Sequence, residues 1–142
     1  MKLKIKLLDE KAIVPRYHYP GDAGLDLFSI ECQEILPGES AGIRTGIAIE
    51  LPEHTEAQIR PRSGLALNHQ ITLLNTPGTI DQGYRGEIRV IMINHGKKPF
   101  TVNEGMKIAQ MVIHTFVSVD VEVTDELSDT HRCERGFGSS GL

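Results

Sequence analysis

Apolar residues in this sequence recur mainly at every second position. The clearest runs cover residues 3–7, 41–51 and 88–93, and further runs cover residues 57–59 and 117–123. Successive side chains of a β-strand point to opposite faces, so a period of two predicts strands that turn one face toward a core. We therefore expect a strand in each of these segments.

Turn-forming residues separate the alternating runs. Short strands between regularly spaced turns predict an all-β protein, either a sandwich or a barrel. The helical pattern is weak throughout, and the best helical candidate is a short piece over residues 63–69. The turn clusters stand at residues 20–22, 36–38, 51–53, 77–78, 95–96 and 104–105.

The length of 142 residues predicts one domain with a single core. Residues 124–142 differ from the rest because they are polar, rich in glycine and poor in apolar side chains. We expect residues 1–123 to form the folded β domain and residues 124–142 to form a flexible C-terminal arm of that domain. From composition alone, the arm is equally well interpreted as a disordered terminus.

Charge and composition exclude several classes of protein. Fifteen basic and nineteen acidic residues give a net charge of −4, which disfavours sequence-independent binding of nucleic acid but allows a small anionic substrate. No segment approaches the roughly 20 apolar residues that span a bilayer, and the start of the chain does not resemble a signal peptide. We expect a cytoplasmic protein that binds no membrane and keeps Cys32 and Cys133 as reduced thiols.

One candidate site lies in residues 75–87, between two apolar runs, where we expect a hairpin with a long loop at the rim of a sheet. Asp81 follows an apolar residue there and stands near Tyr84. A carboxylate at such a rim could orient and deprotonate a water molecule. Aspartate is also common in turns because its side chain binds the backbone. This feature alone therefore does not distinguish a catalytic aspartate from a structural one.

Two other segments could bind phosphate or metal. In residues 61–66 an arginine precedes Ser63, which could cap a short helix whose free N–H groups favour a phosphate, although ordinary capping explains the serine equally well. In residues 21–27 two aspartates in a glycine-rich turn could hold Mg²⁺ through water or could simply form the turn. The six histidines show no metal-ligand spacing.

Taken in order, these segments resemble the five motifs of the homotrimeric dUTP diphosphatases (dUTPases). That family hydrolyses dUTP to dUMP and pyrophosphate with Mg²⁺, which keeps uracil out of DNA and supplies dUMP for thymidylate synthesis. The resemblance implies a jelly-roll-like β fold, a homotrimer, and active sites between subunits. The matching segments are residues 23–27, 61–66, 75–86, 105–110 and 136–141.

The resemblance also implies roles for individual residues. Asp81 would activate the water that attacks the α-phosphorus, and Gln110 would help to place that water. Asp26 would bind the Mg²⁺ through its water molecules. The residues that would hold the phosphate chain come from one motif: Arg62, Ser63 and Gly64.

Base and sugar selection would belong to the hairpin. The ring of Tyr84 would lie against the deoxyribose, so that a ribose hydroxyl meets it. Cytosine would be rejected by mismatched backbone donors and acceptors, and thymine by the tightness of the turn. The groups around uracil would be Asn75 and the main chain at Gly78, Thr79, Ile80, Asp81 and about Arg89.

The C-terminal arm would close over the bound nucleotide. Phe137 would stack on the uracil, and Gly138 and Ser139 would meet the phosphates. Arg132 aligns with the family's arginine for the γ-phosphate, with Arg135 as a possible substitute. Cys133 and Arg135 stand where the family has glycines, which leaves the conformation of the arm open.

Two other functions remain compatible with such a fold. A dCTP deaminase would share the architecture, but that branch resembles this chain less because it lacks the water-activating aspartate of the hairpin. A non-enzymatic β-sandwich could keep the pocket as a nucleotide sensor or a partner-binding surface. The residues needed for hydrolysis are present, which favours the enzyme, with dUTP and further copies of the chain as partners.

Overall fold

A computed structural model describes residues 1–141 of the chain. It contains eleven strands and one short helix. The strands are β1 (Lys4–Leu7), β2 (Leu25–Phe28), β3 (Gln33–Ile35), β4 (Ser40–Arg44), β5 (Ile47–Glu50), β6 (Thr55–Arg60), β7 (Ile71–Leu73), β8 (Gly78–Ile80), β9 (Arg89–Asn94), β10 (Phe100–Val102) and β11 (Lys107–Thr115), and the helix is α1 (Ser63–His69).

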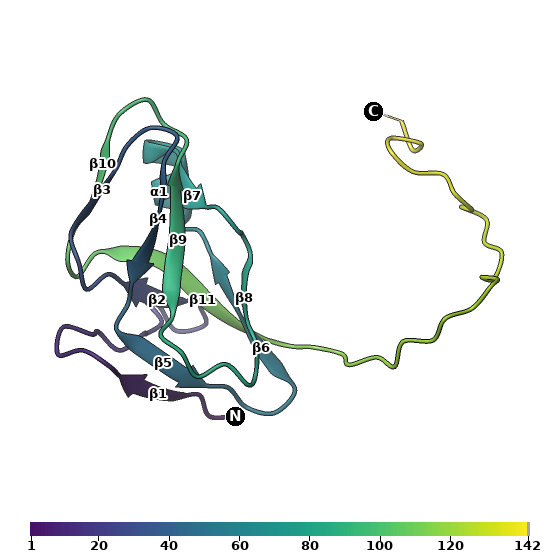
Figure 1. The fold of residues 1–142 in the computed structure, drawn as a ribbon, viewed down its shortest axis with the longest axis horizontal. Helices are drawn as coiled ribbons and strands as arrows, with labels where there is room; N and C mark the ends of the chain where they lie inside the picture. The colour runs from purple at the N-terminus through teal and green to yellow at the C-terminus, as the bar shows by residue number, and fades with distance from the viewer. Residues whose placement is uncertain (142) are drawn as a thin grey trace.

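Two larger sheets face each other across the core (Figure 1). One has the order β2-β11-β6-β8 and the other the order β4-β9-β7, while β1 pairs with β5 and β3 with β10. One buried cluster takes side chains from both large sheets, such as Ile59 and Met111 from the first and Ile43 and Met92 from the second. Burial alternates along β6 and β9, as the period of two predicts.

The all-β fold with one short helix is therefore confirmed, and the helix occupies the expected residues 63–69. The strands of residues 1–141 form four separate hydrogen-bonded sheets and do not close into a barrel. Of the two architectures that the sequence allows, the structure has the sandwich. No helix in residues 1–141 is long and apolar enough to cross a membrane.

The alternating run 41–51 is two strands and not one. β4 pairs with β9, whereas β5 pairs with β1, and the chain turns between them at Gly46, which has a φ of 68°. A side chain at Gly46 would also lie only 3.0 Å from the Cβ of Ala12. Because the hydrophobic alternation continues through this turn, the sequence pattern hides the change of sheet.

The expected hairpin between residues 71 and 93 is present, with an addition. β7 pairs with β9 in antiparallel register, as the sequence predicts. The long loop between them also contains β8, which pairs with β6 in the other large sheet. The loop therefore joins the edges of both sheets, and this fixes the residues that follow β8.

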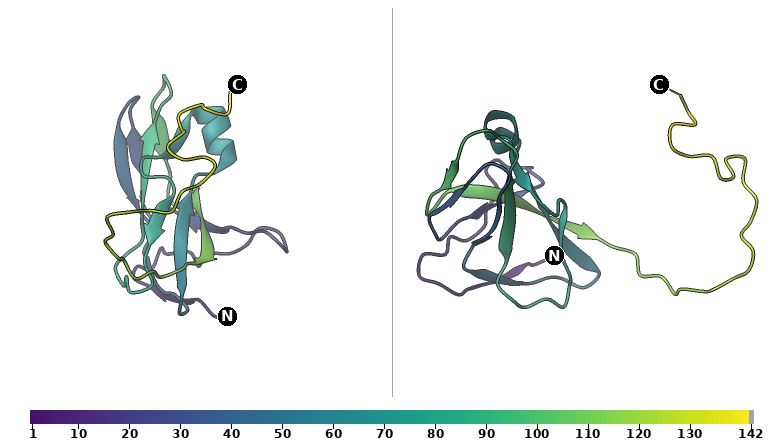
Figure 2. Two further views of the ribbon diagram at one scale, coloured as in Figure 1. Left: turned by 90° about the vertical axis from the view of Figure 1, so that its right-hand side faces the viewer. Right: turned by 45° about the horizontal axis from the view of Figure 1, so that its top comes forward.

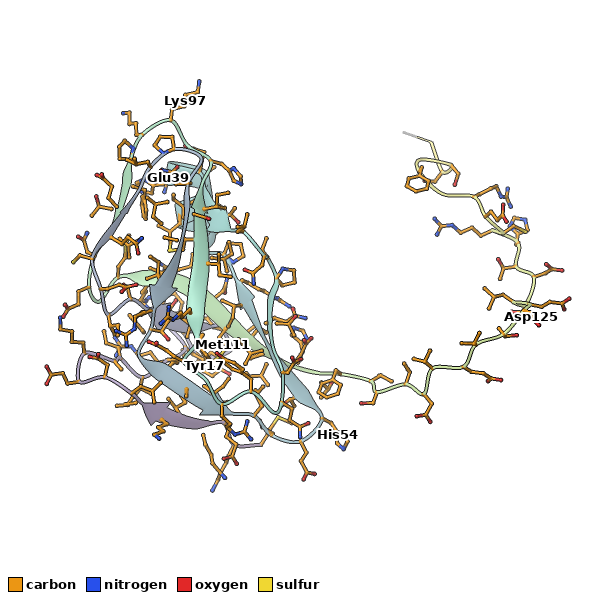
Figure 3. All side chains as sticks on the ribbon, in the orientation of Figure 1. Tyr17, Glu39, His54, Lys97, Met111 and Asp125 are labelled. Atoms are coloured by element: carbon orange, nitrogen blue, oxygen red, sulfur yellow. The ribbon has the colours of Figure 1, made fainter. Side chains whose placement is uncertain are left out.

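Residues 117–123 form no strand, so that prediction is wrong for the described part of the chain. A strand needs a neighbour for its backbone hydrogen bonds, and no strand of residues 1–141 pairs with this segment. From residue 116 the chain runs away from the sandwich (Figure 2), and side chains around Asp125 project from it into solvent (Figure 3). The domain boundary after residue 123 stays a prediction.

Candidate active site

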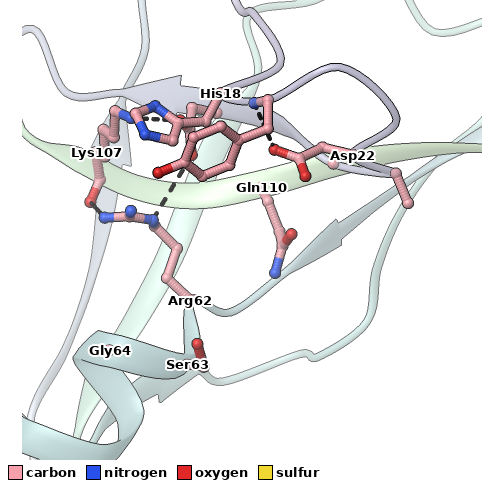
Figure 4. Close-up of a pocket in the computed structure, with 11 residues that line it drawn as sticks. His18, Asp22, Arg62, Ser63, Gly64, Lys107 and Gln110 are labelled. Carbon is pink, nitrogen blue, oxygen red and sulfur yellow. Dashed lines mark hydrogen bonds and ion pairs between the residues drawn. The ribbon is translucent and has the colours of Figure 1, made fainter.

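The first of two candidate pockets surrounds Asp26, and we call it the Asp26 pocket (Figure 4). It has a volume of about 500 Å³ and lies where β2, β11 and the start of α1 meet the loop of residues 18–24. It brings together the residues expected for phosphate and metal. The lining residues include Asp26, Arg62, Ser63, Gly64, Gln110, Lys107 and His18.

Asp26 is buried and faces two cations. Its side chain is 12% exposed, and the Lys107 Nζ lies 2.6 Å from Oδ2. The Arg62 Nε lies 3.7 Å from Oδ1. The Lys107 contact compensates the charge of Oδ2, but its alignment is not that of a hydrogen bond, so Oδ2 is left without a hydrogen-bond donor. A buried carboxylate in this state can accept a further donor, such as water.

Gln110 is fixed at the side of the same pocket. Its Nε2 donates to the carbonyl oxygen of Pro61 at 2.9 Å, while its Oε1 points toward Gly24. A Cβ at Gly24 would clash with that oxygen and lie 3.1 Å from the Cβ of Gln110, so the glycine leaves room for this side chain. In the sheet, Gln110 stands opposite Asp26 on β2 and Arg60 on β6.

The helix begins at the expected residue, but its cap differs from the one that the sequence suggests. The N-cap position belongs to Arg62, with no side-chain capping bond, and Ser63 is the first helical residue. Ser63 is therefore not the cap, because its backbone has already entered the helix. Its side chain is exposed and lines the pocket instead. Arg62 is oriented by a hydrogen bond from its Nη1 to the carbonyl oxygen of Lys107, at 3.2 Å.

The second pocket lies at the rim of the hairpin, and we call it the Asp81 pocket. It has a volume of about 560 Å³ and contains most of the residues expected around the base and sugar. Asp81 directly follows β8 and its side chain is exposed. The lining residues are Gly42, Asn75, Thr79, Ile80, Asp81, Tyr84, Glu87, Arg89 and Ile91.

Tyr84 is held in a defined position within this pocket. Its hydroxyl donates to the carbonyl oxygen of Glu87 at 3.1 Å, and its ring covers Gly86, where a Cβ would lie 2.6 Å from the ring carbon Cζ. Nearby, Gly78 on β8 leaves room for the amide of Asn75, which would lie 3.2 Å from a Cβ at that position. Glycines at both positions thus let side chains lie against the hairpin backbone.

Glu87, which lines the Asp81 pocket, is held by hydrogen bonds and ion pairs. The Glu87 carboxylate accepts from the Arg44 Nε at 3.2 Å and from the backbone N–H of Gly46 at 3.0 Å, and Arg89 lies 3.7 Å away. This hydrogen bond and the attraction of Glu87 raise the pKa of Arg44 above its ordinary value. The sequence did not single out Glu87, because its role depends on strands that are distant in the chain.

The structure does not bring all the expected residues together. Gln110 stands opposite Arg60, whereas Ile80, just before Asp81, stands opposite Ala57. Asp81 and Gln110 are therefore separated by two strand spacings, about 10 Å, and by the offset along β6. Within one chain they belong to different pockets.

The arm residues also lie outside both pockets. Phe137 is fully exposed. Arg132 and Arg135 contact each other's backbone, with the Arg132 Nε 2.9 Å from the carbonyl oxygen of Arg135. None of Arg132, Phe137, Gly138 or Ser139 lines the Asp26 or the Asp81 pocket.

Two side chains of the Asp26 pocket were missed as site residues. Lys107 lies in the segment 105–110 without an expected role of its own, and His18 belongs to the six histidines that show no metal-ligand spacing. A β-bulge between Lys107 and Ala109 shifts the register of β11, so the alternation of the sequence does not show where Lys107 points. Only its position before Gln110 hinted at a role.

A magnesium ion would fit the Asp26 pocket through water rather than through direct ligands. Residues 1–141 contain no cluster of three or more His, Cys, Asp or Glu side chains that could hold a metal. A single carboxylate with an oxygen free to accept a hydrogen bond suits the hydrated ion, which keeps several of its waters. Asp26 is that carboxylate.

Comparisons with known proteins identify the family of the chain. A sequence profile of the dUTPase family matches residues 10–141. The chain is 66% identical over 142 residues to a deoxyuridine 5'-triphosphate nucleotidohydrolase of Gloeothece citriformis, covering 100% of this chain and 98% of that protein. A similar enzyme of Trichodesmium erythraeum is 67% identical, with 99% of each protein covered.

Solved structures give the same result. The dUTPase of Staphylococcus bacteriophage 80alpha with bound dUPNHPP has a TM-score of 0.93 and 28% identity, with 99% of both chains covered. A dUTPase from phage phi11 of S. aureus, described with a structural Mg(II) ion, has a TM-score of 0.84 and 26% identity over 91% of this chain. From the profile match and from relatives this similar over their full length, we conclude that the chain belongs to the dUTPase family.

Proposed function

We propose that this protein hydrolyses dUTP to dUMP and pyrophosphate by attack of water on the α-phosphorus. The observation that carries the proposal is the sorting of the motif residues into two pockets. One contains a cationic and polar surface that suits a phosphate chain, and the other contains a hairpin with an exposed carboxylate. Relatives that are two thirds identical carry the same activity in their names.

In the proposed reaction Asp81 is the general base. It accepts a proton from the attacking water, and Gln110 holds that water in line with the leaving pyrophosphate. Exposure of Asp81 at the rim leaves its oxygens free to accept that proton. No covalent intermediate is required, because water itself is the nucleophile.

Arg62, Ser63 and Gly64 bind the phosphate chain in this proposal. The Arg62 guanidinium is directed into the pocket by its bond to the Lys107 carbonyl oxygen, and a planar guanidinium suits phosphate oxygens. Mg²⁺, when bound with the nucleotide, neutralises the charge that develops on the pyrophosphate. Asp26 orients it by accepting hydrogen bonds from its water molecules.

The hairpin selects the nucleotide. Asn75 and the main chain of residues 78–81 recognise uracil, and the fixed ring of Tyr84 lies against the deoxyribose. A buried hydrogen-bonding group that a wrong base leaves unpaired costs more than a poorly filled space. We therefore propose that cytosine is rejected by its hydrogen bonds and ribose by contact with Tyr84.

We further propose that each active site combines several copies of the chain, in a homotrimer. The separation of Asp81 from Gln110 by two strand spacings supports this, because both must contact the same water. An Asp81 pocket from one copy facing an Asp26 pocket from another would bring them together. Arg132, Phe137, Gly138 and Ser139 of an arm would then cover the nucleotide.

The test is to incubate the purified protein with Mg²⁺ and each of dUTP, dTTP, dCTP, dATP and dGTP, and to measure pyrophosphate. We expect release from dUTP alone at low enzyme concentration. Ammonia release from dCTP would instead identify a deaminase. Nucleotide binding without any product would identify a binding module, and equal release from all five nucleotides would also refute the proposal.

A further inference from the structure

The Asp26 pocket places two cations beside its one buried carboxylate, while its other carboxylate, Asp22, is exposed and accepts a hydrogen bond from the backbone N–H of Tyr19. Lys107 and Arg62 both approach Asp26, at 2.6 and 3.7 Å. A hydrated metal ion near Asp26 would add further positive charge beside the same carboxylate. Three cations around one carboxylate repel one another, whereas the phosphates of a bound nucleotide offer a second anionic partner, so one of the two side chains can change partner when the nucleotide binds.

We propose that Lys107 is this side chain and that it exchanges Asp26 for the phosphates of the nucleotide. In the empty pocket its ammonium neutralises Asp26, and when the nucleotide arrives with its metal ion the ammonium turns to the phosphate oxygens. The inference rests on the proposed function of this pocket. It assigns to Lys107 a role that is separate from that of Arg62.

The contacts of Lys107 suit such an exchange. Besides Asp26, its Nζ lies 3.3 Å from the Nδ1 of His18. An ammonium can only donate, so Nδ1 accepts and the imidazole carries its proton on Nε2. His18 takes one ammonium proton, and because the contact with Asp26 is not aligned as a hydrogen bond, the remaining protons can reach a ligand in the pocket (Figure 4).

Arg62 is less suited to move. Its Nη1 is bound to the Lys107 carbonyl oxygen while its Nε faces Asp26, so the planar group is held at two points. Lys107 carries a compact charge on a flexible stem. The same Nζ position is also in contact with His18, whose ring lies at the edge of Tyr19 with centroids 4.3 Å apart.

The charge of Asp26 connects Lys107 with the binding of metal and phosphate. Asp26 is nearly buried, and removal of the cation that faces a buried carboxylate leaves a charge without compensation. A triphosphate without metal would then be repelled by Asp26. A triphosphate with Mg²⁺ would be repelled less, because the ion supplies the missing charge. Lys107 should therefore matter most when no metal is present.

The experiment measures binding of the imido analogue of dUTP by calorimetry, with Mg²⁺ and with EDTA. In Lys107→Met we expect roughly a 10-fold loss of affinity with Mg²⁺, since a charged contact with phosphate disappears. With EDTA we expect roughly a 100-fold loss, since the buried charge of Asp26 is then left without compensation and repels the triphosphate. The ratio of the affinity with Mg²⁺ to the affinity with EDTA should therefore be about 10-fold larger in Lys107→Met than in the wild-type protein. Lys107→Arg should restore most of the binding.

Two further variants isolate the cause. Lys97→Met removes an equally flexible lysine at the far tip of the sandwich (Figure 3) and should change neither affinity. In the Asp26→Asn background, Lys107→Met should weaken binding by the same factor with and without Mg²⁺, because no carboxylate is left to compensate. Circular dichroism establishes that each variant is folded.

The outcomes separate this inference from the proposed function. If the wild-type protein does not bind the analogue, the proposed function fails. If it binds but Lys107→Met leaves the affinity unchanged, or lowers it equally with Mg²⁺ and EDTA in the presence of Asp26, the exchange is refuted. An unchanged affinity would mean that Lys107 does not contribute to binding. An equal loss under both conditions would mean that Lys107 only contacts the phosphates.

Discussion

The Asp26 pocket and the Asp81 pocket place their carboxylates in opposite environments. Asp26 is buried and paired with Lys107 and Arg62. Asp81 is exposed, and within residues 1–141 its side chain takes part in no hydrogen bond or ion pair. The first carboxylate is surrounded by side chains of the same chain, and the second lies on an open rim.

This difference matches the two tasks of the proposed enzyme. Binding a phosphate chain requires cations and donors that are already in place, since ordering them during binding would cost affinity. A general base must keep its oxygens free for the water. The hairpin supplies that freedom, and β8 supplies the fixed position by joining the edge of the sheet at β6.

The largest effect should come from removing the free carboxylate. In Asp81→Asn the side chain keeps its size but cannot accept the proton of the water, so turnover of dUTP should fall by about 1000-fold. Affinity for the imido analogue should stay within a few-fold of the wild type. Pyrophosphate release and calorimetry measure the two quantities.

Asp120→Asn is the matched control for this variant, because Asp120 is exposed and lies outside both pockets. Its turnover should equal that of the wild type. Normal turnover in Asp81→Asn would show that the rim carboxylate does not act as the base and that the contrast between the pockets has another meaning.

A smaller but still large loss should follow removal of the arm. A chain that ends at Glu126 keeps both pockets, since none of the residues lining them lies beyond residue 126, and should fold normally. Without donors for the phosphates its turnover should fall by about 100-fold. Full activity would show that the arm is dispensable.

The same truncated chain can test whether copies share a site. When it is unfolded and refolded together with full-length Asp81→Asn, activity should return, because one copy supplies Asp81 and another supplies the arm. Two separately inactive variants cannot restore each other if every site is built from one chain. Light scattering on each sample should report the mass of a trimer.

The smallest effect concerns the sugar. Tyr84→Ala removes the ring that is fixed against Gly86, so discrimination between dUTP and UTP, measured as the ratio of their kcat/KM values, should fall by about 10-fold. Tyr84→Phe retains the ring and loses only the bond to the Glu87 carbonyl oxygen, so it should keep most of the discrimination. Equal selectivity in all three proteins would place sugar recognition elsewhere.

Several of these features could be predicted from the sequence. The alternation at residues 88–93 identifies β9, and the weak helical signal at residues 63–69 identifies α1 with its observed bounds. Local patterns suffice here because they reflect which face of a segment is buried. The alternating valines of residues 117–123 show the limit of that reasoning, since they form a strand only where a neighbour is available.

Other features depend on contacts between segments that are distant in the chain. The turn at Gly46 lies within an unbroken alternation, the bulge before Ala109 redirects Lys107, and Ser63 lies one position inside the helix it was expected to cap. Each is decided by the pairing of strands or by the packing of a neighbour. The local sequence pattern of a segment does not show which distant segments it will contact.

The sequence by itself determined the class of fold, the order of the motifs and the chemical groups available to a nucleotide, because side-chain type and hydrophobic period are local properties. The tertiary structure alone decided how those groups are divided. It placed Asp26 beside Lys107 and put Asp81 at the other edge of the sheet. The reason is that strand order in a sheet does not follow order in the chain, so neighbours in space are set by pairing across the whole fold.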